Sequence, residues 1–251
     1  MKRLLKGFYM SFTMFCSLPR PFHVWDEKCL NLVLPSFPLV GAVVGALWWG
    51  ISKILILSGI HFMFTTAILT LLPFLLTGFI HLDGFMDTSD AVLSRRPLEE
   101  KLRILKDPHT GAFAVIMIAV LFVMQFAAMY VAVEKKVLFS LFLVIPVISR
   151  SCASLSILIL KTHTQSNFAN MFRQNSGLKQ NIFIVFILIL SIILSIVFAG
   201  LSGLIVSAAL IAGFSAAMFY AYKDLQGVSG DLAGYALVIG ELCAIIAMAL
   251  L

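Results

Sequence analysis

The chain has 251 residues, of which 61% are hydrophobic and only 12% are charged, and its mean hydropathy is +1.04. This composition excludes an ordinary soluble domain and is typical of an integral membrane protein. The formal net charge of +6 indicates membrane topology and attraction to anionic lipids rather than nucleic-acid binding. Four scattered cysteines without a C-x-x-C pair give no sign of a zinc site or a disulfide framework.

The chain begins with MKRLLKGFYMSFTMFCSLPRP, a basic start followed by a short apolar core. Because it lacks the small-residue cleavage site of a signal peptide, we expect an interfacial or re-entrant helix that ends at Pro19 and Pro21. Seven apolar runs follow that are long enough to cross a bilayer as helices. They lie near residues 36–58, 61–80, 112–133, 137–160, 182–199, 201–222 and 232–251.

The expected fold is therefore all-α: a single domain over residues 1–251, forming a polytopic integral membrane protein with about seven transmembrane helices. Basic residues indicate its orientation, because short cytoplasmic loops collect Lys and Arg. With the N-terminus inside, the cytoplasmic side holds Lys2, Arg3, Lys6, Arg20, Lys28, Arg95, Arg96, Lys101, Arg103, Lys106, Lys161, Arg173, Lys179 and Lys223. The opposite side keeps only Lys53, Lys135 and Lys136, and Arg150 lies within a span.

The segment HLDGFMDTSDAV, residues 81–92, begins where the second span leaves the membrane. On a helix, Asp83, Asp87 and Asp90 are related as i, i+4 and i+7, which places three carboxylates on one stripe. The repulsion between these like charges favours binding of a divalent cation. Mg²⁺ is characteristically held by one or two carboxylates with water and substrate phosphate oxygens. We therefore predict that these aspartates bind Mg²⁺ and that the chemistry is displacement at a pyrophosphate. The alternative for any one of them is a solvated helix end.

Two candidate phosphate-binding features follow the stripe. Arg95, Arg96 and Lys106 belong to a basic cluster that can grip phosphate, although cytoplasmic anchoring explains most of that cluster equally. In KDPHTGAF, residues 106–113, a proline and a glycine break the chain before the third span, and the rigid turn is expected to hold Asp107 near the other carboxylates. An acidic helix cap is the competing interpretation of Asp107.

The segment GVSGDLAGY, residues 227–235, precedes the last span. Its glycines let backbone approach a ligand, and the following helix offers free N–H groups to an anion, so Gly230 and Asp231 are candidate substrate-binding residues. A simple N-cap role for Asp231 stays open. Arg150 and Glu241 lie deeper, where ionisable groups are costly and tend to have partners or a function; their pairing is an open possibility.

The segments GFIHLDGFMDTSDAV, KLRILKDPHTGAFAV and GVSGDLAGYALVIGEL, in this order and spacing, resemble the cobalamin synthase family. FTMFCSLPRP, FPLVGAVVGALWW and the ISRS around Arg150 resemble further parts of it, so the resemblance covers nearly the whole chain. The chain departs from the family pattern at three positions. Ala91 stands where Gly is usual, Lys101 where Arg is frequent, and Val238 where an acidic residue is common.

The resemblance implies an adenosylcobinamide-GDP ribazoletransferase of a prokaryotic cytoplasmic (inner) membrane, with its active-site loops in the cytoplasm. Such an enzyme transfers adenosylcobinamide phosphate to α-ribazole or α-ribazole 5′-phosphate and releases GMP, in the last steps of cobalamin biosynthesis. Asp83, Asp87 and Asp90 would hold Mg²⁺ against the pyrophosphate, and an aspartate or His81 would take the proton from the attacking hydroxyl. A hydrogen-bonded structural role is the alternative for His81. Implied partners are the lipid bilayer, other cobalamin-biosynthesis enzymes and a second copy of the chain.

Two other functions stay open at this point. A CDP-alcohol phosphotransferase also displaces a nucleotide with Mg²⁺ held by helix-borne aspartates, but the further aspartates expected for that family do not occur at the required spacing. A membrane cation transporter would use carboxylates as transit ligands. Its acids would be expected at mid-depth on facing spans, whereas most acids here are predicted at one surface.

Overall fold

The computed structural model describes residues 2–19, 24–135, 139–162 and 167–251. The helices are α1 (Lys2–Phe15), η1 (Glu27–Leu32), α2 (Val33–Leu57), α3 (Phe62–Leu76), α4 (Ile80–Leu93), α5 (Leu98–Ile104), α6 (Ala112–Glu134), η2 (Phe139–Leu143), α7 (Ile145–Ile159), α8 (Asn167–Asn175), α9 (Leu178–Leu225) and α10 (Gly230–Leu250). In these ranges the only β-type pairing is an isolated bridge between Thr162 and Val228. The all-α prediction is confirmed.

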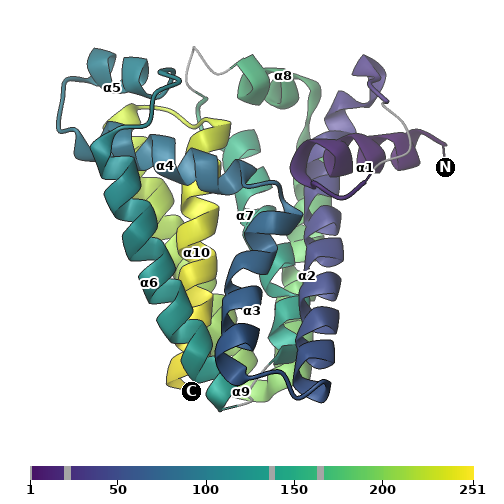
Figure 1. The fold of residues 1–251 in the computed structure, drawn as a ribbon. Helices are drawn as coiled ribbons and strands as arrows, with labels where there is room; N and C mark the ends of the chain where they lie inside the picture. Colours follow the sequence, from purple (N-terminus) through teal and green to yellow (C-terminus); the bar gives the residue numbers. More distant parts are fainter. Residues whose placement is uncertain (1, 20–23, 136–138, 163–166) are drawn as a thin grey trace.

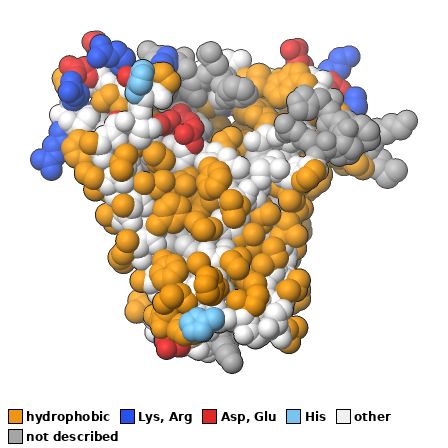
Figure 2. Space-filling model, viewed as in Figure 1, with side chains coloured by type: hydrophobic (Ala, Val, Ile, Leu, Met, Phe, Trp, Pro, Cys, Tyr) orange, Lys and Arg blue, Asp and Glu red, His pale blue; other side chains and the backbone are white. Residues whose placement is uncertain are grey.

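Within the described ranges, five helical segments are long and apolar enough to cross a membrane. They are η1 with α2, α6, η2 with α7, α9, and α10, and α3 together with α4 forms a sixth candidate that is bent by 89°. The large exposed side chains of these spans are apolar, for example Ile116, Val123, Phe186 and Val197. Figure 2 shows this apolar surface extending along the sides of the molecule. A polytopic membrane protein is therefore confirmed.

Helix α9 contains a reversal of the chain at Gly200, whose φ of 58° and ψ of −135° are not helical. The hydroxyl oxygens of Ser195 and Ser207 lie 2.7 Å apart, whereas residues this far apart in one straight helix would be separated by about 18 Å. A Cβ on Gly203 would lie 1.9 Å from the carbonyl oxygen of Ser195, so the two arms approach as backbone against backbone. The arms correspond to the expected runs 182–199 and 201–222. The total of seven crossings stays a prediction.

Small residues and one tryptophan hold the spans together. A Cβ on Gly41 would lie 2.3 Å from the carbonyl oxygen of Pro146, so α2 and α7 touch through their backbones, as small residues allow in membrane helices. Trp48 is fully buried, stacks on Phe142 with ring centroids 4.2 Å apart, and donates Nε1–H to the carbonyl oxygen of Leu69 at 2.9 Å. This bond satisfies the polar group of the ring inside the bundle.

The short helices α1, α4, α5 and α8 gather at one end of the bundle, and α4 runs across the spans (Figure 1). On the face shown in Figure 2, Lys and Arg side chains collect at this same end. Helix α1 ends at Phe15, before Pro19, and its position across the end of the bundle fits the expected interfacial segment. Arg20, Pro21 and Lys136 lie outside the described residues. The cytoplasmic orientation of the basic end stays a prediction.

Candidate active site

Helix α4 owes its direction to a glycine stop signal at the end of α3. Gly78 adopts a left-handed conformation with φ 59°, Phe79 N–H donates to the Phe74 carbonyl at 2.9 Å, and Gly78 N–H donates to the Leu75 carbonyl at 3.2 Å. This is the Schellman arrangement that closes many helices. The expected second span, 61–80, therefore ends early, and the chain turns by 89° into α4.

Helix α4 has one buried and one open face, as the spacing of its residues predicts. Asp83 is exposed, and Asp87 and Asp90 are partly exposed, so the three carboxylates occupy the open side of a helix. The opposite side packs into the protein and contains the buried residues His81, Leu82, Gly84, Phe85, Thr88, Ser89, Ala91 and Val92. The predicted carboxylate stripe exists and lies at the basic end of the molecule.

A fourth carboxylate, from the start of α10, joins this stripe electrostatically. The pKa of Asp87 is raised to about 6 by its partial burial and then by the negative charges of Asp83, Asp231 and Asp90. These four residues are called the carboxylate cluster below. Carboxylates that raise the pKa of Asp87 in this way lack full compensation by cations, which is the condition that a bound divalent ion relieves.

Asp231 reaches the cluster because α4 and α10 touch at a glycine. A Cβ on Gly84 would lie 2.8 Å from both the Cα and the carbonyl oxygen of Asp231, so only glycine permits this approach. The helix N-cap is Ser229, whose Oγ accepts from Leu232 N–H at 3.2 Å. Asp231 is thus not the N-cap, and its negative charge acts on Asp87.

Asp90 has a second contact that ties α4 to the start of α6. Its Oδ1 accepts a hydrogen bond from the backbone N–H of Phe113 at 3.2 Å. A Cβ on Gly111 would lie 1.9 Å from Asp90 Oδ2, so the carboxylate occupies the space that a side chain at 111 would need. Asp90 therefore caps α6 as well as contributing charge to the cluster.

The cluster fits a metal ion shared with a substrate better than a metal ion enclosed by protein. Across the described ranges, no three His, Cys, Asp or Glu side chains are close enough to hold one ion together. Mg²⁺ is commonly bound by one or two carboxylates, with water and substrate phosphates supplying the other ligands. Asp83, which is exposed, and Asp87 are free of a capping role and are the residues suited to this.

The candidate phosphate-binding residues have different surroundings. Arg96 forms an exposed ion pair with Glu100 at 2.6 Å, and Arg95 is exposed at the end of α4 with φ 54°. Lys106 lines a cavity described below. Asp107 accepts hydrogen bonds from His109, from the backbone N–H at 3.0 Å and from Nδ1 at 2.7 Å, which lower its pKa. Asp107 is therefore engaged locally, and nothing in its contacts joins it to the cluster.

Sequence reasoning missed the ion pair that fixes α5. Lys101 is buried, and its Nζ lies 2.7 Å from both carboxylate oxygens of Asp224 at the end of α9. The two residues are 123 positions apart, so no local spacing signals their contact.

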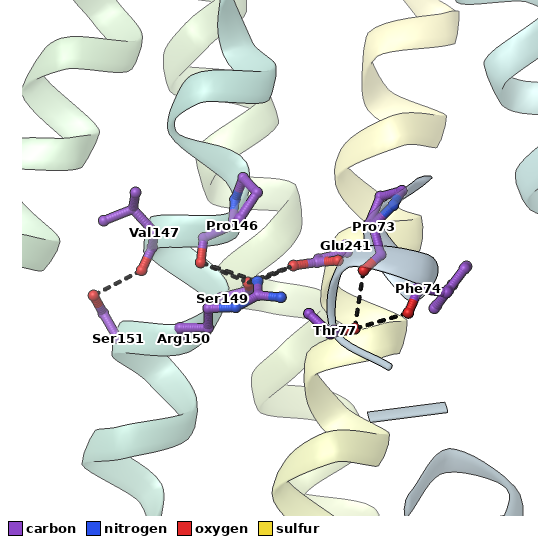
Figure 3. A network of polar contacts seen from close by, with 9 residues as sticks. All are labelled: Pro73, Phe74, Thr77, Pro146, Val147, Ser149, Arg150, Ser151 and Glu241. Carbon is purple, nitrogen blue, oxygen red and sulfur yellow. Dashed lines mark hydrogen bonds and ion pairs between the residues drawn. The ribbon is translucent and has the colours of Figure 1, made fainter. Parts of the chain in front are cut away.

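Arg150 and Glu241 form the buried ion pair that the sequence left open (Figure 3). Arg150 NH1 lies 2.8 Å from Glu241 Oε1, and Ser149 Oγ donates to the same carboxylate oxygen at 2.6 Å. Arg150 is only 1% exposed, so this guanidinium is directed to Glu241 and not to the carboxylate cluster. The Arg150 Cζ also lies 5.7 Å from the centre of the Phe37 ring. Phe37 in turn stacks on His81.

His81 is buried beneath α4 and has an unsatisfied nitrogen. It is 7% exposed, and its ring stacks on Phe37 with centroids 5.6 Å apart and planes 10° from parallel. Burial and the charge of Arg150 hold its pKa well below the usual range, so the imidazole is neutral. Nδ1 has no hydrogen-bond partner among the described residues. A neutral, buried imidazole is suited to hydrogen bonding rather than to carrying a proton.

Two cavities flank the first turn of α4. The first, the apolar cavity, has a volume of about 480 Å³ and is lined by residues that include Phe15, Phe37, His81, Ala153, Phe172 and Asp231. The second, the polar cleft, has a volume of about 600 Å³ and is lined by Thr13, Ser17, Thr77 and Asp83, among others. Met14 and Ile80 line both, so the two spaces adjoin, with one cluster carboxylate on each side.

Comparisons with known proteins agree along the whole chain. The family model described as cobalamin-5-phosphate synthase matches residues 7–249. A protein of Clostridium botulinum (strain Alaska E43 / Type E3) is 36% identical over 242 residues, covering 96% of both chains. One of Clostridium perfringens (strain 13 / Type A) is 34% identical over 251 residues, covering 100% of both. Both are named adenosylcobinamide-GDP ribazoletransferase. No solved structure matches.

Proposed function

Because the chain belongs to the cobalamin-5-phosphate synthase family, we propose that it is an adenosylcobinamide-GDP ribazoletransferase dependent on Mg²⁺. The donor is adenosylcobinamide-GDP, and the acceptor is α-ribazole or α-ribazole 5′-phosphate. The acceptor hydroxyl oxygen forms a bond to the phosphorus that carries the cobinamide, the bond from that phosphorus to the bridging oxygen breaks, and GMP leaves. The products are adenosylcobalamin, or its 5′-phosphate, and GMP.

The observation that carries this proposal is the carboxylate cluster at the basic end of the spans. Asp83 and Asp87 stand on the open face of α4, and Asp231 adds charge from α10. When bound, Mg²⁺ neutralises charge on the pyrophosphate oxygens and stabilises the leaving phosphate. Asp83 and Asp87 are the residues that would hold it, and a carboxylate of the cluster accepts the proton of the attacking hydroxyl.

The ion pair of Glu241 argues against ion transport as the main function. Glu241 is the acidic residue buried within α10, and Arg150 neutralises it at 2.8 Å. A carboxylate that is paired in this way is a poor transit ligand for a cation. The carboxylate cluster lies at the basic end of the spans, where a water-soluble donor can reach it.

The test is transfer by the full-length protein in liposomes with Mg²⁺, adenosylcobinamide-GDP and α-ribazole 5′-phosphate, with both products followed by chromatography. We expect GMP and cobalamin 5′-phosphate in equal amounts, both lost on chelation of Mg²⁺. Asp83→Asn and Asp87→Asn keep side-chain size and remove charge, so turnover should fall by about 10²-fold or more. Glu99→Gln is the matched control, because Glu99 is an exposed acid of α5, and it should keep full turnover.

Near-normal turnover in both aspartate variants would remove the metal-site assignment. Failure of folded wild-type protein to form either product with both ribazole acceptors would refute the reaction itself. Transfer to a simple alcohol from a CDP-linked donor, or cation flux without any donor, would then identify the alternative function.

A further inference from the structure

The apolar cavity lies next to the carboxylate cluster but differs from it in chemistry. Its wall comes from α1, α2, α7 and α8 on one side and from the facing turns of α4 and α10 on the other. Phe15, Phe37 and Phe172 supply aromatic surface, and Ala153 and Ile157 supply small and branched aliphatic surface. A site of this kind favours a flat apolar group with few polar atoms.

We propose that the apolar cavity binds the aromatic base of the ribazole acceptor, which packs against the phenylalanine rings of its wall. This inference rests on the proposed function and adds the location of one of its two substrates. The volume of about 480 Å³ lies in the range typical of sites for small organic ligands, about 300–1,000 Å³. A corrinoid macrocycle with its many amide groups needs a larger and more polar site, and a diphosphate cannot be desolvated against phenylalanine rings.

His81 and Phe37 form a stacked pair in the wall of this cavity. Their ring centroids lie 5.6 Å apart with planes 10° from parallel, and both residues line the space. Nδ1 of His81 is enclosed by protein, so it offers no hydrogen bond to a molecule in the cavity. Recognition of the base therefore rests on apolar and aromatic contact with the wall.

Polar residues in the wall of the cavity place the rest of the acceptor correctly for transfer. Asp231, Ser229, Gly230 and Lys106 also line this space, so a ribosyl group attached to a base in the cavity extends toward the carboxylate cluster. The polar cleft, with Asp83, opens on the other side of Ile80. In-line displacement requires the attacking and leaving oxygens on opposite sides of phosphorus. An acceptor bound in the apolar cavity and a donor pyrophosphate bound beside the polar cleft satisfy this requirement.

The first experiment measures α-ribazole binding to the full-length protein by equilibrium dialysis, without Mg²⁺ and without donor. We expect saturable binding that free benzimidazole displaces and GMP does not. Ala153→Leu fills the cavity and should weaken binding by about tenfold or more.

Matched variants keep the result interpretable. Ala208→Leu adds the same side chain on the exposed surface of α9 and should bind like wild type. If Ala153→Leu fails to fold, Ala169→Leu fills the same cavity from α8. Wild-type affinity in a folded cavity-filling variant, or displacement of α-ribazole by GMP, would overturn the proposal.

Turnover separates this inference from the proposed function. In the transfer assay, Ala153→Leu should raise the acceptor KM about tenfold and leave the donor KM unchanged. A raised donor KM instead would show that the cavity belongs to the donor, while the proposed reaction stands. If wild-type protein catalyses no transfer, the proposed function fails, and the binding experiment alone decides whether the cavity takes the base.

Discussion

Gly84 lies on the face of α4 that contacts the start of α10, and its replacement by alanine tests whether this contact sets the geometry of the site. The added Cβ would lie 2.8 Å from the Cα and carbonyl oxygen of Asp231, whereas ordinary contact begins at 3.4 Å. Both neighbours are backbone atoms, so no side-chain rotation relieves the clash. The two helices must separate by about 0.6 Å, the difference between these two distances.

Two free-energy terms oppose each other in Gly84→Ala. Alanine favours a helix over glycine by about 1 kcal/mol, and an overpacked contact costs about 1–3 kcal/mol. The net loss of stability is therefore small, about 0–2 kcal/mol. Turnover should respond more strongly, because a misplacement of about 1 Å can cost about 10²-fold. For a shift of this size between Asp231 and the α4 carboxylates, we expect turnover to fall about tenfold or more.

The assay is the initial rate of GMP release in liposomes at saturating substrates, paired with a thermal unfolding midpoint for each protein. Gly50→Ala is the control, because no atom lies within 4 Å of the Cβ added at this α2 position. It gains the same helix propensity and should keep the wild-type rate. Gly84→Ala should remain folded and lose rate. Wild-type rate and midpoint in Gly84→Ala would refute the reasoning that this backbone contact positions the cluster.

Three further outcomes follow from the charges and contacts of the site. Folding raises the pKa of Asp87 from 3.8 to about 6, so the metal-free protein should lose stability as pH rises through this interval, and Mg²⁺ should restore it. The fall in unfolding midpoint between pH 5 and pH 7.5 should be smaller in Asp87→Asn than in wild type. An equal fall in the two proteins would contradict this. Glu241→Gln leaves the buried Arg150 charge unpaired, and we expect a loss of about 3–5 kcal/mol, measured as a lower unfolding midpoint and a reduced yield of folded protein; an unchanged midpoint would show that the pair contributes little. Gly111→Ala should displace the Asp90 carboxylate from the start of α6 and lower turnover, whereas equal turnover would mean that Asp90 acts only as a cap.

Local patterns in the sequence were sufficient for the class of helical membrane protein and for the carboxylate stripe. Asp83, Asp87 and Asp90 recur at helical spacing, and α4 places them on its open side. Gly78, which follows an apolar run, signals the end of α3, although the predicted span continued past it to residue 80. The glycine at 200 was correctly left between two runs, since it lies where the chain reverses inside α9. These features depend on residues only a few positions apart.

Local patterns did not predict the contacts between distant segments. Lys101 meets Asp224, and Arg150 meets Glu241, but the chain offers several other cations and anions that the same spacing would allow. The place of Asp107 beside the stripe stays a prediction, and the contacts that the structure shows for its carboxylate are with His109. Only the folded arrangement decides which of many compatible charges become neighbours.

The sequence by itself determined that this protein is a helical membrane protein with an acidic stripe at one end, because hydropathy and helical periodicity are properties of short segments. The tertiary structure decided that Asp231 joins the stripe, that His81 and Phe37 line an apolar cavity, and that this cavity adjoins the cluster. These depend on the close approach of α4 and α10 at Gly84. Such an approach is set by the packing of whole helices, and no stretch of either helix encodes it alone.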